Sequence, residues 1–116
     1  MTKTEQNFLS YIKPYTDKKN NIIIPQLNLQ AIFKTNNIKS FNKIKSKSID
    51  FAIVDQNYNY KLFIELDDYT HNQAKRIIRD NFINDLFKQY NLKLKRVKVK
   101  NEYNINELSE ILKEIE

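Results

Sequence analysis

The chain has 116 residues, a formal net charge of +6, no cysteine, no glycine and a single histidine. Its length suits one compact domain, and its 41% hydrophobic and 29% charged residues are typical of a globular protein. This composition excludes disulfides, thiolate zinc sites, sites that need two histidines and glycine-rich phosphate loops. Because no apolar run approaches the ~18 residues that span a bilayer and the first ten residues are polar, we expect a soluble, cytoplasmic protein without a membrane partner.

The first part of the chain is predicted to contain one helix and one strand. A helix over residues 2–15 is favoured by Thr2 and Glu5, which have the spacing of a capping box. Residues 22–29 have the composition of a strand. Residues 30–47 predict one short helical turn followed by a polar, basic connection.

The second part of the chain contains the clearest elements. Alternating apolar residues predict strands over 48–55 and 60–67, joined by a four-residue hairpin loop. Apolar residues at helical spacing predict a long helix over 70–90, then a basic strand over 92–100 and a last helix over 104–116. The order α-β-β-β-α-β-α predicts one α/β sandwich domain with a central mixed sheet.

Acidic residues face one another across the predicted hairpin. If the loop is symmetric, Phe51 pairs with Ile64 and Asp50 pairs with Glu65, while Asp67 lies on the same face as Glu65. Like charges directly opposite each other destabilise a strand pair. A divalent cation such as Mg²⁺ relieves this repulsion and can activate water for phosphodiester cleavage. A register offset by one or two residues would instead leave these acids solvated.

Several short segments carry a family resemblance. The sequence reads Ile-Asp-Phe at 49–51, Phe-Ile-Glu-Leu-Asp-Asp at 63–68, Thr-His at 70–71 and Arg-Asp at 79–80. With these motifs the chain, over residues 4–99, resembles the PD-(D/E)xK nuclease superfamily. Within that superfamily it is similar to an uncharacterised bacterial branch of restriction-endonuclease-like domains, which is related to very-short-patch repair endonucleases. The resemblance implies a restriction-endonuclease-like fold.

The resemblance also implies a metal site. Asp50 and Glu65 match the two carboxylate ligands of Mg²⁺ or Mn²⁺, and the backbone carbonyl of Leu66 would complete the ligand set. Glu5 matches an acidic residue that often adds a further ligand or water contact. Its alternative role is that of capping partner to Thr2.

One position departs from the family pattern. Asp67 stands where the superfamily usually has a lysine that orients or activates the attacking water. His71 is a candidate substitute because imidazole acts as acid or base near neutral pH, although a lone histidine can equally be an incidental polar residue. The predicted catalytic residues are therefore Glu5, Asp50, Glu65, Asp67 and His71.

Basic side chains flank the acidic hairpin in the sequence. The histidine, Lys75 and Arg79 recur every four residues and share one helix face. Cations near phosphates release condensed counterions and so favour nucleic-acid binding. Solvation of a helix face and protection of an edge strand by lysines are the alternatives. The predicted nucleic-acid contacts are Lys45, Lys47, Lys75, Arg79 and Lys95.

These observations predict a metal-dependent endonuclease that hydrolyses phosphodiester bonds, most readily in DNA. The replacement of the family lysine by Asp67 favours an alternative, a catalytically inactive nuclease-like fold that binds nucleic acid or a protein partner. The chain could also be a subunit or fragment of a larger enzyme. A homodimer is a further expectation, with the apolar stripe of the last helix as its surface.

Overall fold

The computed structural model describes residues 1–34, 38–68 and 73–115. In these residues, four strands form one open sheet in the order β1-β2-β3-β4. The first three strands are antiparallel neighbours and β4 runs parallel to β3, so the predicted mixed sheet is confirmed. The strands are β1 (Ile22–Asn28), β2 (Ser48–Val54), β3 (Tyr60–Asp67) and β4 (Leu94–Lys98).

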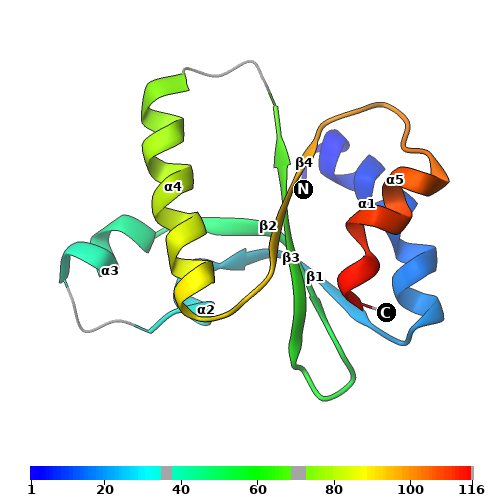
Figure 1. Ribbon diagram of the computed structural model, residues 1–116, viewed down its shortest axis with the longest axis horizontal. Coiled ribbons are helices and arrows are strands. Elements are labelled where there is room, and N and C mark those ends of the chain that lie inside the picture. Colours follow the sequence, from blue (N-terminus) through cyan, green and yellow to red (C-terminus); the bar gives the residue numbers. More distant parts are fainter. Residues whose placement is uncertain (35–37, 69–72, 116) are drawn as a thin grey trace.

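Helices cover both faces of the sheet in a mixed α/β fold (Figure 1). One face carries the first and last helices, and the other carries the three helices between them. The capping box predicted at the N-terminus of the first helix is present, with reciprocal hydrogen bonds between Thr2 and Glu5. The helices are α1 (Lys3–Lys18), α2 (Leu29–Ile32), α3 (Ile38–Ile44), α4 (Gln73–Gln89) and α5 (Ile105–Ile111), followed by a 3₁₀ turn, η1 (Lys113–Ile115).

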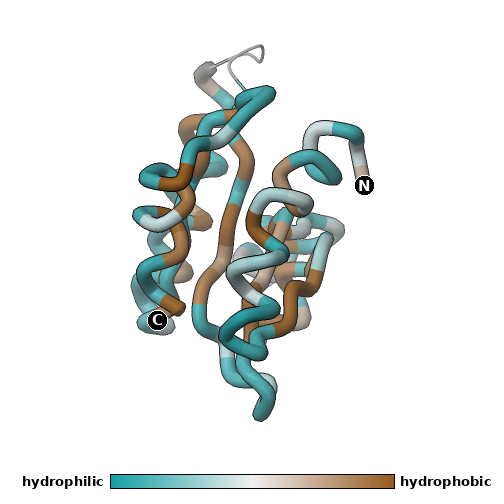
Figure 2. Tube along the Cα trace, turned by 90° about the vertical axis from the view of Figure 1, so that its right-hand side faces the viewer, coloured by the Kyte–Doolittle hydropathy of each residue, from teal (hydrophilic) through white to brown (hydrophobic). Residues whose placement is uncertain are grey.

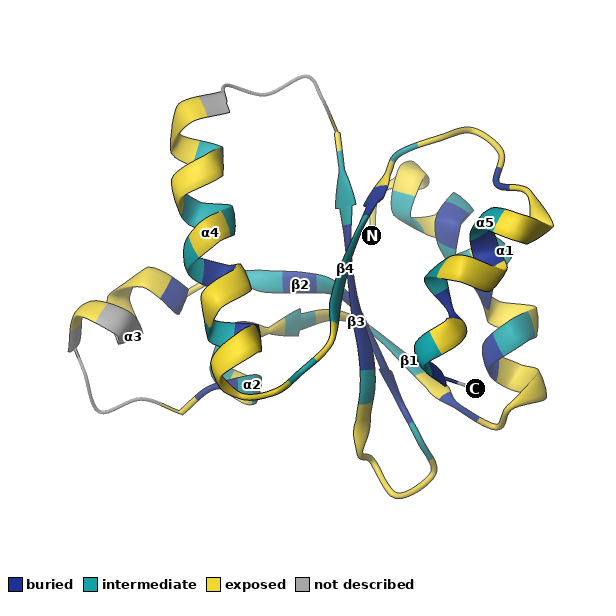
Figure 3. Cartoon of the chain, in the orientation of Figure 1, coloured by how far each residue is buried: buried dark blue, intermediate teal, exposed yellow. Residues whose placement is uncertain are grey.

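The core consists of two apolar clusters separated by the sheet. Phe8 and Phe51 pack in the cluster under α1 and α5, with ring centroids 5.6 Å apart. Phe63 and Phe87 pack edge-to-face at 4.8 Å in the cluster under α4. Hydrophobic and hydrophilic residues alternate along α1 and α5, which face the viewer in Figure 2. Successive side chains of β2 and β3 point to opposite faces of the sheet, so these two strands contribute residues to both clusters. Both strands are mostly buried (Figure 3).

The long helix α4 differs from its prediction in the face that it buries. Its C-terminal half packs on the sheet through Ile83 and Phe87, but Ile77 and Ile78 in its N-terminal half are exposed. That half contributes no residue to the apolar cluster beneath the helix and meets the end of β3 through ion pairs of Arg76 and Arg79. Periodicity identified residues that share a helix face, but only the C-terminal part of that face packs in the core.

Two further expectations were wrong. Residues 34–47, expected to be an irregular connection, contain α3. The hairpin loop is not symmetric, because the pairing shifts between Ile53 and Val54. Both oxygens of Asp55 accept hydrogen bonds from the loop residues that follow, which closes the turn early and brings Val54 opposite Tyr60.

The apolar stripe of the last helix packs inside the domain. Leu108, Leu112 and Ile115 are buried in the cluster beneath α1 and α5, while Ile105 remains exposed. The stripe therefore does not offer the dimer surface expected of it, and a homodimer stays a prediction. In the part of the chain that the structure describes, none of the helices has the length and apolar character needed to cross a bilayer.

Candidate active site

Asp50 and Glu65 meet where the β2–β3 ladder ends. The predicted register is confirmed at Phe51 and Ile64. Beyond this pair, the backbone N–H of Asp50 donates to Oε1 of Glu65 at 2.8 Å, and the N–H of Leu66 donates to Oδ2 of Asp50 at 2.8 Å. Each carboxylate thus takes the place of a carbonyl as acceptor from the opposite strand, so the positions of both side chains are fixed by the backbone.

Near Asp50, the edge strand β1 departs from the regular alternation of side chains between the two faces of the sheet. Ile24 and Leu27 lie three residues apart yet pack in the same cluster beneath α4, and so do Ile49 and Ala52 on β2. Regular strands would place residues three apart on opposite faces. The change on β1 occurs at Gln26, whose φ of 54° lies in the left-handed region.

Gln26 lies between the β1–β2 pairs on either side of Asp50. Its side-chain amide donates a hydrogen bond to Oε2 of Glu5, while Oε1 of Glu5 accepts the N–H of Thr2 at 3.0 Å. The two roles considered for Glu5 are therefore compatible. It caps α1 with one oxygen and faces the site with the other.

The two central carboxyl groups resist ionisation. Burial, followed by the charge of Asp50, raises the pKa of Glu65 to about 7. Burial is also the main cause that raises the pKa of Asp50, and the charge of Glu5 adds to it, against the lowering effect of the Leu66 hydrogen bond. Both shifts favour the protonated, neutral carboxyl groups.

Arg79 is the cation next to this pair. Its Nη2 lies 3.9 Å from Oε2 of Glu65, and its Nη1 lies 3.3 Å from Oδ1 of Asp80. The helix face that sequence spacing assigned to Arg79 therefore does point toward the carboxylates. His71, on the same predicted face, lies outside the described residues.

Asp67 is engaged by arginines rather than facing the pair. Its Oδ1 lies 3.3 Å from Nη2 of Arg76 and 3.5 Å from Nη1 of Arg96. Arg96 also lies 3.4 Å from Oδ1 of Asp80, so two acids and two arginines form a network between α4 and β4. Asp67 therefore holds two arginines in place.

A pocket reaches Asp50 from the α1 side. Its volume is about 260 Å³, and it contains Asp50, Glu5 and Leu66. Glu65 is not part of its lining and is only 7% exposed. The remaining lining residues are Thr2, Thr4, Asp68 and Val99.

These residues suit a hard divalent cation. Over residues 1–34, 38–68 and 73–115, no group of three or more acidic or histidine side chains could hold a metal ion. Mg²⁺ usually binds one or two carboxylates, retains waters and takes further oxygens from phosphates. Asp50 and Glu65 supply two carboxylates at one place, and a bound cation would favour their ionised forms against the burial that raises their pKa values.

The predicted nucleic-acid contacts do not all gather at one place. Lys47, Lys75 and Arg79 line a common pocket between α4 and the start of β2. Lys45 is exposed in the turn after α3 and does not line it. Lys95 points to the α5 side, where its Nζ donates to the carbonyl of Glu110 at 2.6 Å.

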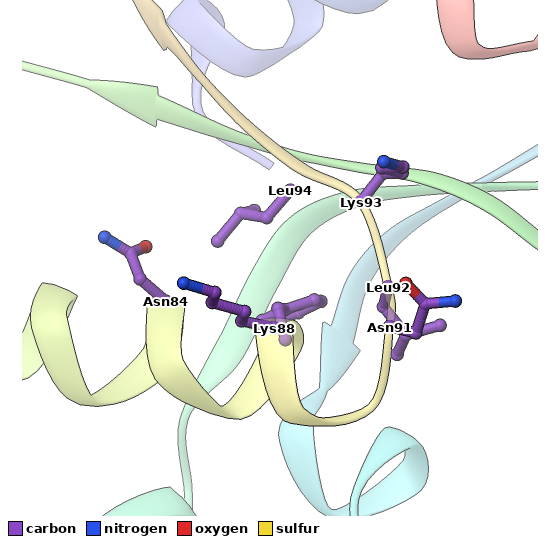
Figure 4. Close-up of a pocket in the computed structure, with 7 residues that line it drawn as sticks. Asn84, Lys88, Asn91, Leu92, Lys93 and Leu94 are labelled. Carbon is purple, nitrogen blue, oxygen red and sulfur yellow. The ribbon is translucent and has the colours of Figure 1, made fainter.

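A separate pocket, of about 310 Å³, lies where α4 turns toward β4 (Figure 4). Asn84, Lys88 and Lys93 lie around it, and no carboxylate lines it. It is therefore distinct from the acidic site. Sequence reasoning missed Gln26, because glutamine carries no signal for a left-handed conformation. It also gave no functional role to Phe82, which lines the pocket shared by Lys47 and Arg79.

Comparison with known proteins places the chain in a family. Residues 1–115 match the profile described as protein of unknown function (DUF2726), so the chain belongs to that family. Searches of curated proteins and of solved structures gave no match.

Proposed function

We propose that this domain is a metal-dependent nuclease that hydrolyses phosphodiester bonds in DNA. The observation that supports it most directly is the pair of hydrogen bonds by which Glu65 accepts the backbone N–H of Asp50 and Asp50 accepts the backbone N–H of Leu66. A buried carboxylate (Glu65) and a half-buried one (Asp50), held close together against their repulsion, favour binding of a divalent cation. The order of elements and the mixed sheet are compatible with a restriction-endonuclease-like arrangement, which is part of the proposal.

In the proposed reaction, each group of the chain has one task. Asp50 and Glu65 hold the cation, with Leu66 beside them. Bound Mg²⁺ or Mn²⁺ supplies Lewis acidity and lowers the pKa of a bound water. Glu5, oriented by Gln26, extends the acidic wall of the pocket and accepts a hydrogen bond from such a water.

Arg79 takes the part of the missing family lysine. Its guanidinium adjoins Glu65 on the α4 side and is positioned by Asp80. A fixed cation at this place stabilises the negative charge that develops on the phosphate during attack. Lys47 and Lys75 lie in the same pocket as Arg79 and supply contacts to neighbouring phosphates.

The proposal is tested by cleavage of supercoiled plasmid and single-stranded DNA with Mg²⁺ or Mn²⁺. We expect Asp50→Asn and Glu65→Gln to lower the rate by about 100-fold or more. The exposed carboxylates of Asp85 and Glu102 provide matched controls. Asp85→Asn and Glu102→Gln should cleave at the unmodified rate.

The ion pairs of Asp67 favour a second function, a nuclease-like fold that binds nucleic acid without cutting it. Salt-sensitive retention of DNA without metal-dependent cleavage would support this second function and contradict the first. If the protein neither cuts nor retains DNA at low salt, both nucleic-acid functions are wrong.

A further inference from the structure

A second pocket lies directly behind the acidic pair. Its volume is about 230 Å³, and it lies between α4 and the segment that links α3 to β2. Arg79 lines it and also lies 3.9 Å from Glu65, so this residue connects the two places. The pocket is lined by Lys43, Lys47, Lys75, Ile78, Arg79 and Phe82.

The charge of this pocket has one sign. Four of its six lining side chains are cationic and none is acidic. Among the described residues, no carboxylate oxygen lies within 4.0 Å of the side-chain nitrogen of Lys43, Lys47 or Lys75, so these lysines form no ion pair there. An anionic ligand would stabilise this group of unpaired cations by neutralising their charge.

The wall between these cations is apolar. Ile78 is 72% exposed, and Phe82 on the same helix is partly buried. The four cations would suffice for phosphate alone, which makes no use of an apolar wall. An exposed isoleucine next to an aromatic ring instead suits a flat apolar group that is attached to an anion.

The ring of Phe82 is already covered by a charge. Nζ of Lys43 lies 4.7 Å from its centroid. At an exposed site such a cation–π contact is weaker than the stacking of a nucleobase on an aromatic side chain. A nucleotide therefore gains by replacing the ammonium on the ring while Lys43 moves to its phosphate.

We infer that this pocket binds an unpaired nucleotide of the substrate strand, its base against Phe82 and Ile78 and its phosphates against Lys43, Lys47 and Lys75. The inference rests on the proposed action on nucleic acid and narrows the substrate class. In a duplex the bases are paired and stacked, so the substrate strand must be single-stranded, or opened, next to the phosphate that Arg79 contacts.

Fluorescence anisotropy tests this pocket in EDTA, where cleavage is absent. The probes are a labelled single-stranded DNA, the same strand with abasic sites, and its duplex. We expect the intact strand to bind about 10-fold more tightly than the abasic strand. Ile78→Glu and Phe82→Leu should remove this difference, and Phe82→Leu keeps the apolar volume that the core requires.

The lysines have a matched control in the pocket of Figure 4. Replacing Lys43, Lys47 and Lys75 together by glutamine should lower the salt slope of single-strand binding by about 2, because each phosphate contact contributes about 0.7. Lys88→Gln with Lys93→Gln should leave both the slope and the preference for the intact strand unchanged. Equal binding of all three probes, or equal losses in the control, would overturn the inference.

Cleavage of the same strand with Mg²⁺ separates this inference from the proposed function. If the intact strand is preferred in EDTA yet is not cut, the pocket binds nucleotides and the nuclease proposal is wrong. If the strand is cut while binding ignores both the base and the pocket variants, the pocket inference alone is wrong.

Discussion

Asp50 and Glu65 face each other across two strands, and each carboxylate accepts a backbone N–H from the strand opposite. At this point of the sheet, two carboxylates accept the hydrogen bonds that backbone carbonyl groups accept elsewhere between the strands. Hydrogen bonds to charged groups are stronger than neutral ones, so the backbone is held firmly. The cost falls on the carboxyl groups, which lose solvation and repel each other.

The raised pKa of Glu65 predicts an unusual dependence of stability on pH. Below pH 4.5, the ordinary pKa, the folded and unfolded chains both hold the proton. Between pH 4.5 and about 7 the unfolded chain releases it first, so the free energy of unfolding falls as pH rises. The shift corresponds to a loss of about 3 kcal/mol above pH 7.

Urea denaturation in EDTA measures this loss. Glu65→Gln keeps an oxygen for the N–H of Asp50 but cannot ionise, so its stability relative to the unmodified protein should rise by about 3 kcal/mol from pH 4.5 to above pH 7. Glu102→Gln, at an exposed position, should follow the unmodified protein. A Glu65→Gln profile parallel to the unmodified one would show that this carboxyl titrates normally.

Addition of Mg²⁺ above pH 7 should reverse the loss. A cation that binds only the folded chain stabilises it by about 2.7 kcal/mol at 100 times its dissociation constant, which corresponds to a rise in Tm of roughly 10 °C for a domain of this size. Asp50→Asn should abolish the shift, and Asp85→Asn should retain it. An equal shift in Asp50→Asn would place the cation elsewhere.

The hairpin shows how far sequence alone could go. Alternating apolar residues set the register at Phe51 and Ile64, and that register brought Asp50 opposite Glu65. Spacing by four also placed Arg79 on the face that meets the carboxylates. Both results depend only on the local periods of strand and helix.

Other features depend on contacts far away in the sequence. The left-handed conformation of Gln26 has no local signal, because glycine and asparagine are the residues that usually adopt it. The exposure of Ile78 depends on which part of α4 packs on the sheet, and only the C-terminal part, from Phe82 onward, belongs to the core. The ion pairs of Asp67 depend on Arg96, which the parallel strand β4 brings next to β3.

Replacing Asp67 by lysine, the residue that the proposed nuclease resemblance expects there, should destabilise the protein. Asp67→Lys would place a third cation beside Arg76 and Arg96, which are each less than a quarter exposed. Breaking this partly buried network should cost roughly 2 kcal/mol, with no gain in cleavage, because Arg79 already supplies the cation next to Glu65.

Thermal denaturation and plasmid cleavage measure both effects. Asp17→Lys is the matched control, since it breaks an exposed ion pair with Lys13 and should change the stability by less than about 1 kcal/mol. Faster cleavage by Asp67→Lys without loss of stability would mean that the lysine position is vacant and that Arg79 does not replace it.

At Gln26, the usual order of stability between alanine and glycine variants should be reversed. Gln26→Gly and Gln26→Ala both lose the hydrogen bond to Glu5, but only alanine keeps a Cβ in the left-handed region. The glycine variant should therefore be more stable than the alanine variant by about 1–2 kcal/mol. At the exposed strand position Lys98 the order should be reversed, with glycine less stable by about 0.5–1 kcal/mol.

The same two variants separate strain from orientation of the site. If Gln26 orients Glu5 toward the cation, both should weaken Mg²⁺ binding by about 10-fold, a loss typical of residues that orient metal ligands. Titration of Tm with Mg²⁺ gives the affinity independently of the stability difference. Unchanged affinity in both variants would limit Gln26 to shaping the edge strand, and weaker binding in alanine alone would assign the effect to backbone strain.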